Sequence, residues 1–519
     1  MKNFYAKYKL IVNALILALV PILACFIRTL LDHKGLGDVF IASGEWNDEQ
    51  FYFKQIECMV RDTIPKGYFG YNESAAKVLS FGTWSPVILI PWAIWGKLFG
   101  WTLMSPIIAN IVFLTIALFV FAILAKPDFK QTLFIFVLLM VTTPLTRYLL
   151  SSMCEIVCLV PIVILMGLVC GYNKGNHKKL RYTFMYICLV FMTLMRPYYV
   201  LFFAFPFFAE KKNKWSQKSV SAIIAILSLV AYFIVMHFLT SSYIGSVYNT
   251  AWLDTFATDG FFKGIAGFFK YLISMLRDIL LAGIGGARGG YPQGIYFAGF
   301  LFVLLIYIIE TMRLLTFGSS YGKWALSMML VSFGILFAMA AMYSIQDGFR
   351  HLMIFIVAGI ILLPFLEHRV YIEEVVTAAA LIWLFVIKAS NPLYFDVVYK
   401  DSNPLVTEEK LEMISDELSK AMTVTDELSW DNTLDIVFLD TTVEDPEGDL
   451  VTLNWQFAYG APEGIAISIC IGDFVCENID SLNSRYIMVQ NNSRVQGLLE
   501  SRSAAKIAGN ELVSFYKLR

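Results

Sequence analysis

Long uncharged runs of apolar residues recur along the first three quarters of the chain, and they constrain its fold more than any other feature. A membrane-spanning helix needs about 20 mostly apolar residues, and these runs are too long for the core of a soluble protein. Of the 519 residues, 58% are hydrophobic and 16% are charged, whereas soluble domains have about 45–50% and about 25%. The sequence therefore predicts a mainly α polytopic membrane protein and excludes a soluble enzyme, a disordered scaffold and a collagen-like fibre.

Eleven apolar runs are each predicted to hold one spanning helix. They are residues 10–27, 98–125, 131–146, 156–172, 182–195, 197–209, 219–253, 289–309, 324–346, 352–366 and 375–387. The first run follows Lys2, Lys7 and Lys9 and has the features of either a signal peptide or a membrane anchor. We favour the anchor because no small-residue cleavage site follows it.

The charge is divided unevenly between two parts of the chain. Residues 390–519 hold 22 acidic and 9 basic residues, a net charge of −13, whereas residues 1–389 hold 19 acidic and 31 basic residues, a net charge of +12. A basic hydrophobic body and an acidic polar tail indicate two physical environments, so we predict two domains, 1–389 and 390–519. Nucleic-acid binding is not expected, because the basic residues are confined to short loops between apolar runs.

The lysine-rich loops predict how the chain is oriented in the plasma membrane. The clusters at 126–130, 174–181 and 211–218 fall on one side only if residues 182–209 form two short helices that turn back at Arg196-Pro197. With a cytoplasmic amino terminus and eleven spans, the tail lies outside. Two long outer loops remain, 32–85 and 240–290, and the Pro-interrupted run 81–99 is predicted to be an interfacial helix.

The tail has the pattern of a small extracytoplasmic α/β domain. Residues 405–422 predict an amphipathic helix capped by Thr407. Strand-like runs follow at 435–439, 465–471, 486–489 and 512–518. Strands mixed with helices are typical of an α/β fold.

Two adjacent acidic residues stand at a predicted helix start in the first outer loop. Asn47 is a favourable N-cap, and the helix dipole favours the negative charges of Asp48 and Glu49 behind it. Tyr52 and Gln55 share a face with Asp48 at helical spacing. We expect this helix to lie on the outer membrane surface with one carboxylate towards the bilayer boundary. The alternative is an ordinary solvated acidic helix start.

Single basic residues near the outer boundary are candidates for binding a phosphate: Arg147, Arg196, Arg288 and Arg350, with His351. Ionisable groups near membrane depth are costly and are usually paired or functional. Each of these residues therefore either binds an anion or pairs with a neighbour such as Glu155. Arg288 lies in a Gly-rich turn, which either presents backbone amides to a phosphate or only connects two helices.

Residues 261–281 mix apolar side chains with Lys263, Lys270, Arg277 and Asp278. This pattern predicts a helix that lies on the membrane surface, where it either covers a groove for a lipid donor or anchors the chain.

The order of these landmarks resembles the GT-C superfamily of membrane glycosyltransferases. The nearest branches are the dolichyl-phosphate-mannose protein mannosyltransferases and the bacterial aminoarabinose transferases of lipid A. These share an Asp-Glu pair in the first outer loop and a Tyr three residues after the Glu, which Asp48-Glu49 and Tyr52 match. Arg196 and Arg350 stand in turns that match Arg-containing outer turns of the family. The resemblance covers about residues 10–367.

Two positions depart from the aminoarabinose branch. Phe51 stands where that branch has an Arg, and Trp84-Ser85-Pro86 stands where it has Lys-Pro-Pro. Since both missing cations would help to hold a donor phosphate, the substrate class of that branch is not carried over.

The resemblance implies transfer of a sugar from a polyprenyl-phosphate-linked donor to an envelope glycan, lipid or protein on the outer face. It implies that Asp48 is the catalytic base, that Glu49 assists in catalysis, and that Tyr52 and Gln55 position the substrates. It also implies that the basic residues above stabilise the leaving phosphate. An Asp-Glu pair alone is too little to predict a metal site, so no cofactor is predicted and a divalent metal stays an open alternative.

Two other functions are compatible with the sequence. One is a transporter or flippase of a lipid-linked glycan, in which the same arginines would grip phosphate during passage. The other is a non-catalytic membrane assembly protein that displays its tail to a partner.

Overall fold

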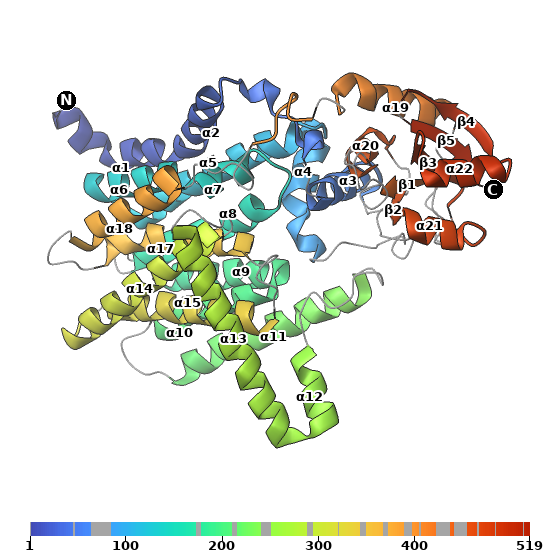
Figure 1. Ribbon diagram of the computed structural model, residues 1–519. Coiled ribbons are helices and arrows are strands. Elements are labelled where there is room, and N and C mark those ends of the chain that lie inside the picture. Colours follow the sequence, from blue (N-terminus) through green and yellow to red (C-terminus); the bar gives the residue numbers. More distant parts are fainter. Residues whose placement is uncertain are drawn as a thin grey trace.

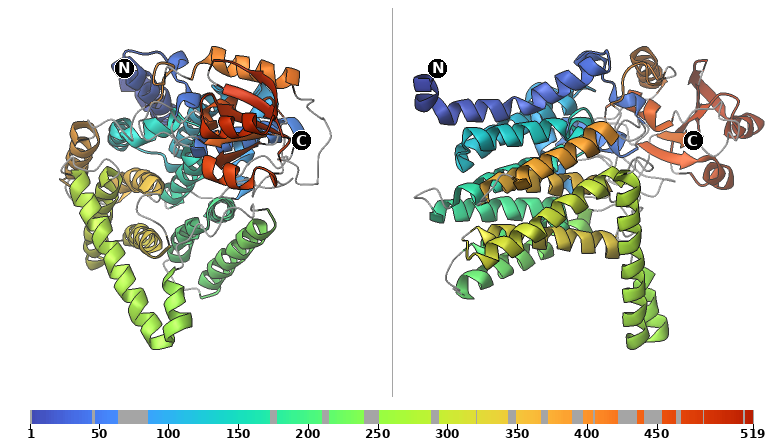
Figure 2. Two further views of the ribbon diagram at one scale, coloured as in Figure 1. Left: turned by 45° about the vertical axis from the view of Figure 1, so that its right-hand side comes forward. Right: turned by 60° about the vertical axis from the view of Figure 1, so that its left-hand side comes forward.

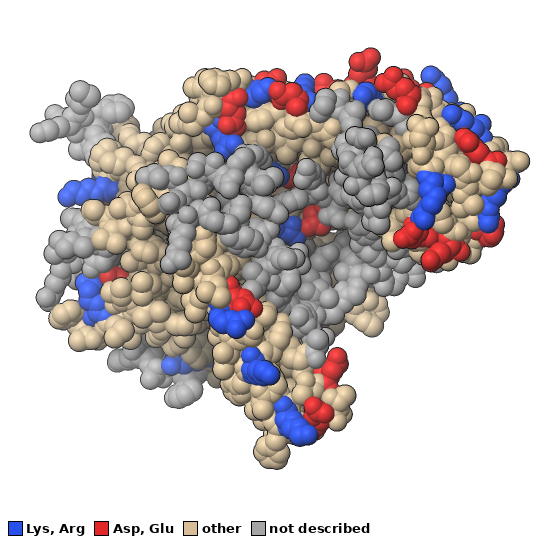
Figure 3. Space-filling view, in the orientation of Figure 1, with Lys and Arg blue, Asp and Glu red and all other residues tan. Residues whose placement is uncertain are grey.

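The computed structural model describes residues 2–44, 47–63, 85–172, 178–209, 215–239, 251–287, 294–319, 321–342, 349–366, 372–388, 397–403, 406–421, 436–440, 454–463, 467–482, 484–511 and 513–518. A bundle of helices carries a small α/β domain at one end (Figure 1). The amino terminus lies at the opposite end of the bundle (Figure 2). Charged side chains gather over the α/β domain, whereas the bundle shows mostly uncharged surface in the view of Figure 3.

The helices of the bundle follow the predicted apolar runs. They are α1 (Lys2–Ala18), α2 (Val20–Leu31), α5 (Ser105–Ala125), α6 (Phe129–Val141), α7 (Thr143–Leu149), α8 (Glu155–Gly171), α9 (Lys178–Met195), η5 (Pro197–Phe203), α10 (Ala204–Phe208), α11 (Trp215–Leu239), α14 (Gly294–Thr316), α15 (Gly322–Met342), α17 (Leu352–Leu362), η7 (Leu363–Phe365), α18 (Ile372–Ile382) and the π-helix η8 (Trp383–Lys388).

Several of these helices are long and apolar enough to cross a membrane. Within the described residues there are five such stretches, and the pair α6–α7, bent by 69°, would make a sixth. Other predicted runs form shorter apolar helices, among them Glu155–Gly171 and Phe349–Phe365. The polytopic membrane class is thereby confirmed, and the count of eleven spans stays a prediction.

The predicted reversal of the chain at Arg196-Pro197 is confirmed. The hydroxyl of Tyr182, near the start of α9, donates a hydrogen bond to the carbonyl of Pro206 at 2.6 Å. One turn further, the ring of Tyr186 lies 6.1 Å from that of Phe203. The two arms therefore run antiparallel.

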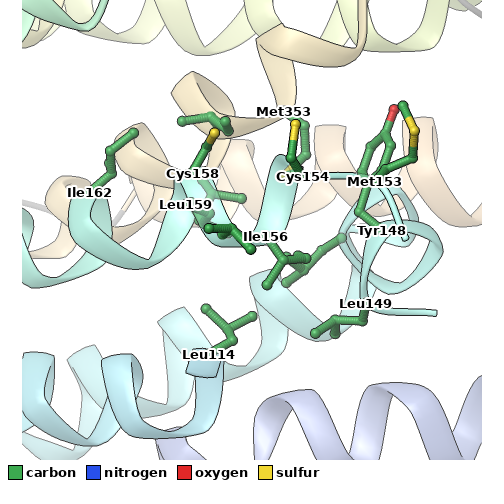
Figure 4. Close-up of a cluster of buried hydrophobic side chains, with 14 of the residues drawn as sticks. Leu114, Tyr148, Leu149, Met153, Cys154, Ile156, Cys158, Leu159, Ile162 and Met353 are labelled. Carbon is green, nitrogen blue, oxygen red and sulfur yellow. The ribbon is translucent and has the colours of Figure 1, made fainter. Parts of the chain in front are cut away.

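The core of the bundle is built around α8, which packs between α5 and α17. Figure 4 shows Leu114 of α5 and Met353 of α17 on opposite sides of α8, and both side chains are buried. Gly167 lets α8 approach α5 closely, because a Cβ atom there would lie 3.0 Å from the Cα atom of Phe121. Small residues at such contacts are typical of helix packing in membranes, where van der Waals contact drives association.

The elements at the end of the bundle that meets the α/β domain come from the two predicted outer loops, from the predicted interfacial run 81–99 and from the turn before α17. They are η1 (Leu36–Asp38), η2 (Ile41–Ser43), α3 (Asn47–Asp62), η3 (Pro86–Ile88), α4 (Ile90–Phe99), α12 (Ala251–Asp259), α13 (Phe261–Ala287) and η6 (Phe349–His351).

The carboxyl-terminal part of the chain is the α/β domain that the sequence predicted. Its elements are α19 (Glu408–Ala421), β1 (Ile436–Asp440), α20 (Asn454–Phe457), η10 (Ala458–Gly460), β2 (Ile467–Ile471), α21 (Gly472–Asn478), β3 (Tyr486–Gln490), α22 (Arg494–Ser501), β4 (Ala505–Gly509) and β5 (Val513–Lys517). The sheet has the order β2-β1-β3-β5-β4. β1 pairs in parallel with β2 and β3, and Phe438 lies opposite Ile469 and Met488. β5 pairs antiparallel with β3 and β4. The predicted boundary at residues 389 and 390 lies outside the described residues.

The two faces of this sheet belong to different cores. Ile487, Val489 and Tyr516 pack with the helices α21 and α22 in a core of their own. Met488 and Phe515 point to the other face and join a core that continues into the bundle. The α/β domain is therefore packed against the bundle and not only tethered to it.

Candidate active site

The helix α3 begins where the sequence predicted and holds its two acidic residues in different surroundings. Asp48 has a side chain that is 31% exposed, and its Oδ2 lies 2.6 Å from Nη2 of Arg350. Glu49 is 1% exposed, and its Oε1 lies 3.0 Å from Nη2 of Arg147. The neighbouring carboxylates thus pair with different arginines, and only the first remains accessible.

The charged side chains continue from the Asp48–Arg350 pair into the bundle. Arg350 Nε lies 3.8 Å from Oε1 of Glu155, and the same oxygen accepts a hydrogen bond from Arg196 Nη2 at 3.0 Å. Arg196 Nη1 donates to Nδ1 of His351 at 2.6 Å. Glu155, Arg196 and His351 are all fully buried. Because unpaired charge is costly away from water, this alternation of acidic and basic groups stabilises the buried charges.

Helix ends position several of these side chains. Glu155 lies in the first turn of α8, and Arg196 directly follows the last residue of α9. A carboxylate at the amino end and a cation at the carboxyl end both interact favourably with the helix dipole. From the sequence, Glu155 was predicted only as a partner for an arginine. Its place at the start of an uncharged run was the available signal that it is central.

Buried polar contacts hold the turn between α7 and α8 against the site. Ser152 Oγ donates to the carbonyl of Glu49 at 2.9 Å. Asn110 donates to the carbonyl of Tyr148 at 3.2 Å and accepts from Trp92 Nε1 at 3.1 Å. These polar groups in the bundle are structural, and they fix the backbone beside the ion pairs.

The predicted positioning residues lie on the same helix as the acids. Tyr52 is buried, and its burial raises the pKa of the phenol, an effect that the nearby charge of Asp48 strengthens and that of Arg350 opposes. The phenol is therefore neutral and can donate a hydrogen bond. Gln55 is also buried. Arg288, the remaining candidate, lies outside the described residues.

The surroundings of Glu49 act on its pKa in opposite directions. Burial raises the pKa of Glu49, whereas the charge and hydrogen bond of Arg147 lower it. The Oε2 atom of Glu49 and both polar atoms of the adjacent Gln50 side chain are buried and have no hydrogen-bond partner within the described part of the chain. Unsatisfied buried polar groups are rare and often mark functional positions.

The α/β domain covers the opposite face of α3. Lys54, only 3% exposed, lies 2.7 Å from Oε2 of Glu57 and donates to the carbonyl of Ala461 at 2.7 Å. Gln456 Nε2 donates to the carbonyl of Gly44 at 3.0 Å, shortly before α3 begins. The alternative of an ordinary solvated helix start is therefore wrong, because Glu49 and Lys54 are buried and the α/β domain takes the place of solvent on that face. The position of α3 at the outer membrane surface stays a prediction.

Sequence reasoning missed the residues of the α/β domain that reach α3. The ring of Tyr459 lies 5.2 Å from that of Phe53, and both side chains are buried. Nothing local in residues 454–463 indicates a partner about 400 positions earlier, so no signal in a single sequence could have found them.

The donor set at the start of α3 does not fit a divalent cation. Such ions take several oxygen ligands, whereas Asp48 and Glu49 are each already paired with an arginine. Among the described residues, no group of three or more His, Cys, Asp or Glu side chains could hold a metal.

Comparisons with known proteins give a fold. No family model and no curated protein matches the sequence. Among solved structures, the chain is similar to the oligosaccharyltransferase of Archaeoglobus fulgidus in complex with Zn and sulfate, with a TM-score of 0.51 and 11% identity over 93% of this chain and 67% of that one. ArnT from Cupriavidus metallidurans bound to undecaprenyl phosphate gives a TM-score of 0.42 and 9% identity, over 96% of this chain and 97% of that one. Apo ArnT gives the same two values, over 96% of each chain. The likeness to the oligosaccharyltransferase confirms the predicted GT-C fold.

Proposed function

We propose that this protein is a glycosyltransferase that moves a sugar from a polyprenyl-phosphate-linked donor to a hydroxyl of an envelope glycan, lipid or protein. The observation that carries the proposal is the accessible Asp48 carboxylate beside Arg350, backed by the buried charges of Glu155 and Arg196 and by the imidazole of His351. A base next to a cation at the end of a membrane bundle suits a reaction that needs a proton acceptor and an anion site together. A fold shared with a GT-C enzyme is compatible with this chemistry but does not establish it.

The reaction would use each charge in turn. The acceptor oxygen attacks the anomeric carbon of the sugar, and the bond from that carbon to the phosphate oxygen breaks. The phosphate leaves with the bonding electrons, and the acceptor proton passes to Asp48. Arg350 stabilises the negative charge that develops on the leaving phosphate.

The ion pair between Asp48 and Arg350 sets the order of events. In the resting site, the guanidinium holds the carboxylate at 2.6 Å, so the carboxylate is engaged with Arg350 and not with an acceptor hydroxyl. An arriving donor phosphate competes for the same guanidinium, and arginine binds phosphate as readily as carboxylate. Donor binding would therefore release Asp48 when its basicity is needed.

Glu49 has a different role in this proposal. Its burial and its pairing with Arg147 keep it away from the accessible side of the site. Glu49 and Arg147 would fix the start of α3, while Arg196 and His351 would orient Glu155 behind Arg350. Tyr52 and Gln55 would line the side of α3 that faces the sugar.

The test is a transfer assay with the purified full-length chain in proteoliposomes. A radiolabelled polyprenyl-phosphate sugar is supplied, and transfer of label to a water-soluble acceptor or to water is measured. Label that moves between leaflets without release from the carrier would contradict the proposal and support a flippase. A donor that is neither cleaved nor moved between leaflets would support a non-catalytic protein.

A further inference from the structure

The hairpin formed by α12 and α13 stands apart from the proposed active site. Its first residues are fixed to the bundle, since Trp252 Nε1 donates to the carbonyl of Ala341 at 3.0 Å. Ala341 lies near the end of α15 that leads towards η6. From there the hairpin runs across the direction of the bundle helices, close to the level where the α/β domain begins (Figure 2).

The two helices of the hairpin pack against each other through the sides that face each other. The rings of Trp252 and Phe268 are 4.7 Å apart. Gly264 allows a close approach, because a Cβ atom there would meet the ring of Phe256 at 2.4 Å. Nearer its carboxyl end, α13 packs on the bundle through Ile279, which is buried.

A second face of α13 carries exposed apolar side chains, here named the apolar stripe: Phe262, Phe269, Ile273, Leu280 and Ile284. Their spacing of seven and four residues places them on one side of the helix. Phe262 is 85% exposed and Ile273 is 65% exposed. The stripe runs from Phe262 to Ile284, which is about 33 Å of helix. Apolar area of this extent marks a surface that contacts another apolar phase.

Basic side chains border the apolar stripe and form what we name the basic row: Lys263, Lys270 and Arg277. They recur every seven residues and are all exposed. Arg277 also contacts Asp278 at 3.0 Å. A stripe of apolar residues flanked by Lys and Arg is typical of helices that lie in the interface of a membrane.

We propose that the α12–α13 hairpin lies in the interface of the membrane leaflet on the side of the active site and binds anionic phospholipid there. The orientation of the hairpin supports contact with phospholipid, because a helix that crosses the direction of spanning helices at their end lies parallel to the membrane. The position of the charges supports it too, although Asp254, Asp259 and Asp278 leave the hairpin without net charge. The basic row borders the apolar stripe, where Lys and Arg attract anionic headgroups while their stems remain along the apolar surface. The inference does not rest on sugar transfer and is tested without turnover.

The experiment uses the full-length chain with p-benzoylphenylalanine in place of Ile273, in vesicles of equal phosphatidylglycerol and phosphatidylcholine. Irradiation is expected to give phospholipid adducts, in which phosphatidylglycerol exceeds phosphatidylcholine by about fivefold, the effect of one basic residue near an anionic surface. The same probe in place of Asn492, an exposed residue of the α/β domain, should give no lipid adduct. Adducts to polypeptide, or none, at position 273 would overturn the proposal.

A charge reversal separates the basic row from the apolar stripe. The triple variant Lys263→Glu, Lys270→Glu, Arg277→Glu should keep the lipid adducts at position 273 but bring the ratio of the two lipids to one or below. Reversal of three exposed basic residues of the α/β domain, Arg494, Arg502 and Lys506, is the matched control and should leave the ratio unchanged. Equal adducts of the two lipids in the unreversed chain would refute the anionic preference.

Discussion

The two faces of α3 meet different parts of the molecule and are held in different ways. Towards the bundle, Asp48 and Glu49 form ion pairs with arginines of η6 and α7. Towards the α/β domain, Lys54 donates a hydrogen bond to the backbone of Ala461 and forms an ion pair within its own helix. The first face includes one accessible ion pair, Asp48–Arg350, whose partners a phosphate could exchange, whereas the contacts of the second face are buried.

This difference indicates a division of work along one short helix. A guanidinium that is 16% exposed and held by an accessible carboxylate can exchange its partner for a phosphate. A lysine that is 3% exposed and bonded to a carbonyl has no such exchange available. The bundle side is therefore expected to govern chemistry, and the α/β side to govern the position of the helix.

Replacing Asp48 by Asn should have the largest effect on activity. The amide keeps the size of the side chain but cannot accept the acceptor proton, and a general base typically contributes about 10²–10⁴-fold. We expect kcat to fall about 10³-fold with little change in the thermal midpoint, measured by transfer of labelled sugar. Asp62→Asn, at the other end of the same helix, is the matched control and should retain activity. Equal loss in both variants would mean that α3 is only damaged.

Replacing Arg350 by Gln should have the next largest effect. Loss of one preorganised group that stabilises developing negative charge costs about 10²–10³-fold, so we expect a fall in kcat of about 10²-fold. Arg350→Lys restores the charge but not the planar fork, and should recover part of the rate. The exposed Arg494 of the α/β domain, changed to Gln, is the control. If Arg350→Lys and Arg350→Gln are equally impaired, charge is not the reason.

Much of the fold could be predicted because its helices and most of its strands follow from local runs of residue type. Uncharged runs marked the bundle helices, and the strands β1, β2, β3 and β5 coincide with runs of β-branched and aromatic residues. β4 was missed because Ala505–Gly509 is an edge strand in which a single Ile stands among small residues and one Lys, so it has no apolar run to detect. The reversal at Arg196-Pro197 was predictable from the distribution of lysine in the loops.

The site was only partly predictable, because its parts are joined by tertiary contacts. Asp48 and Arg350 were each selected from the sequence, but their pairing across about 300 residues follows from how α3 and η6 meet. Glu155 joins Arg350 and Arg196 for the same reason. The cover over α3 was not predictable, since Gln456 and Ala461 reach it from a domain whose packing leaves no local signature.

Replacing Lys54 by Met tests the face towards the α/β domain and should have a smaller effect. The variant loses the hydrogen bond to Ala461 and leaves Glu57 buried without its cation, so α3 should be held less firmly. We expect about a tenfold rise in KM for the acceptor, little change in kcat, and faster proteolysis between the two domains. Lys34→Met removes an exposed ion pair with Asp401 and should change neither readout by more than twofold. A fall in kcat alone would place Lys54 in the chemistry instead.

Replacing Glu49 by Gln should have the smallest effect on activity and a distinct effect on stability. Burial raises the pKa of Glu49, so the folded chain binds this proton more tightly than the unfolded chain. Stability from this source is present below the ordinary glutamate pKa, about 4.3, and is lost as the pH rises through the raised value. Glu49→Gln lacks this loss, so its thermal midpoint should match that of the parent at low pH and exceed it by about 2–4 °C at neutral pH.

The measurement is thermal unfolding in detergent across this range, with the exposed Glu412→Gln as the control that should follow the parent. A variant that becomes less stable than the parent as the pH rises would mean that the attraction of Arg147 exceeds the cost of burial, and that the two ion pairs of α3 are more alike than their exposure indicates.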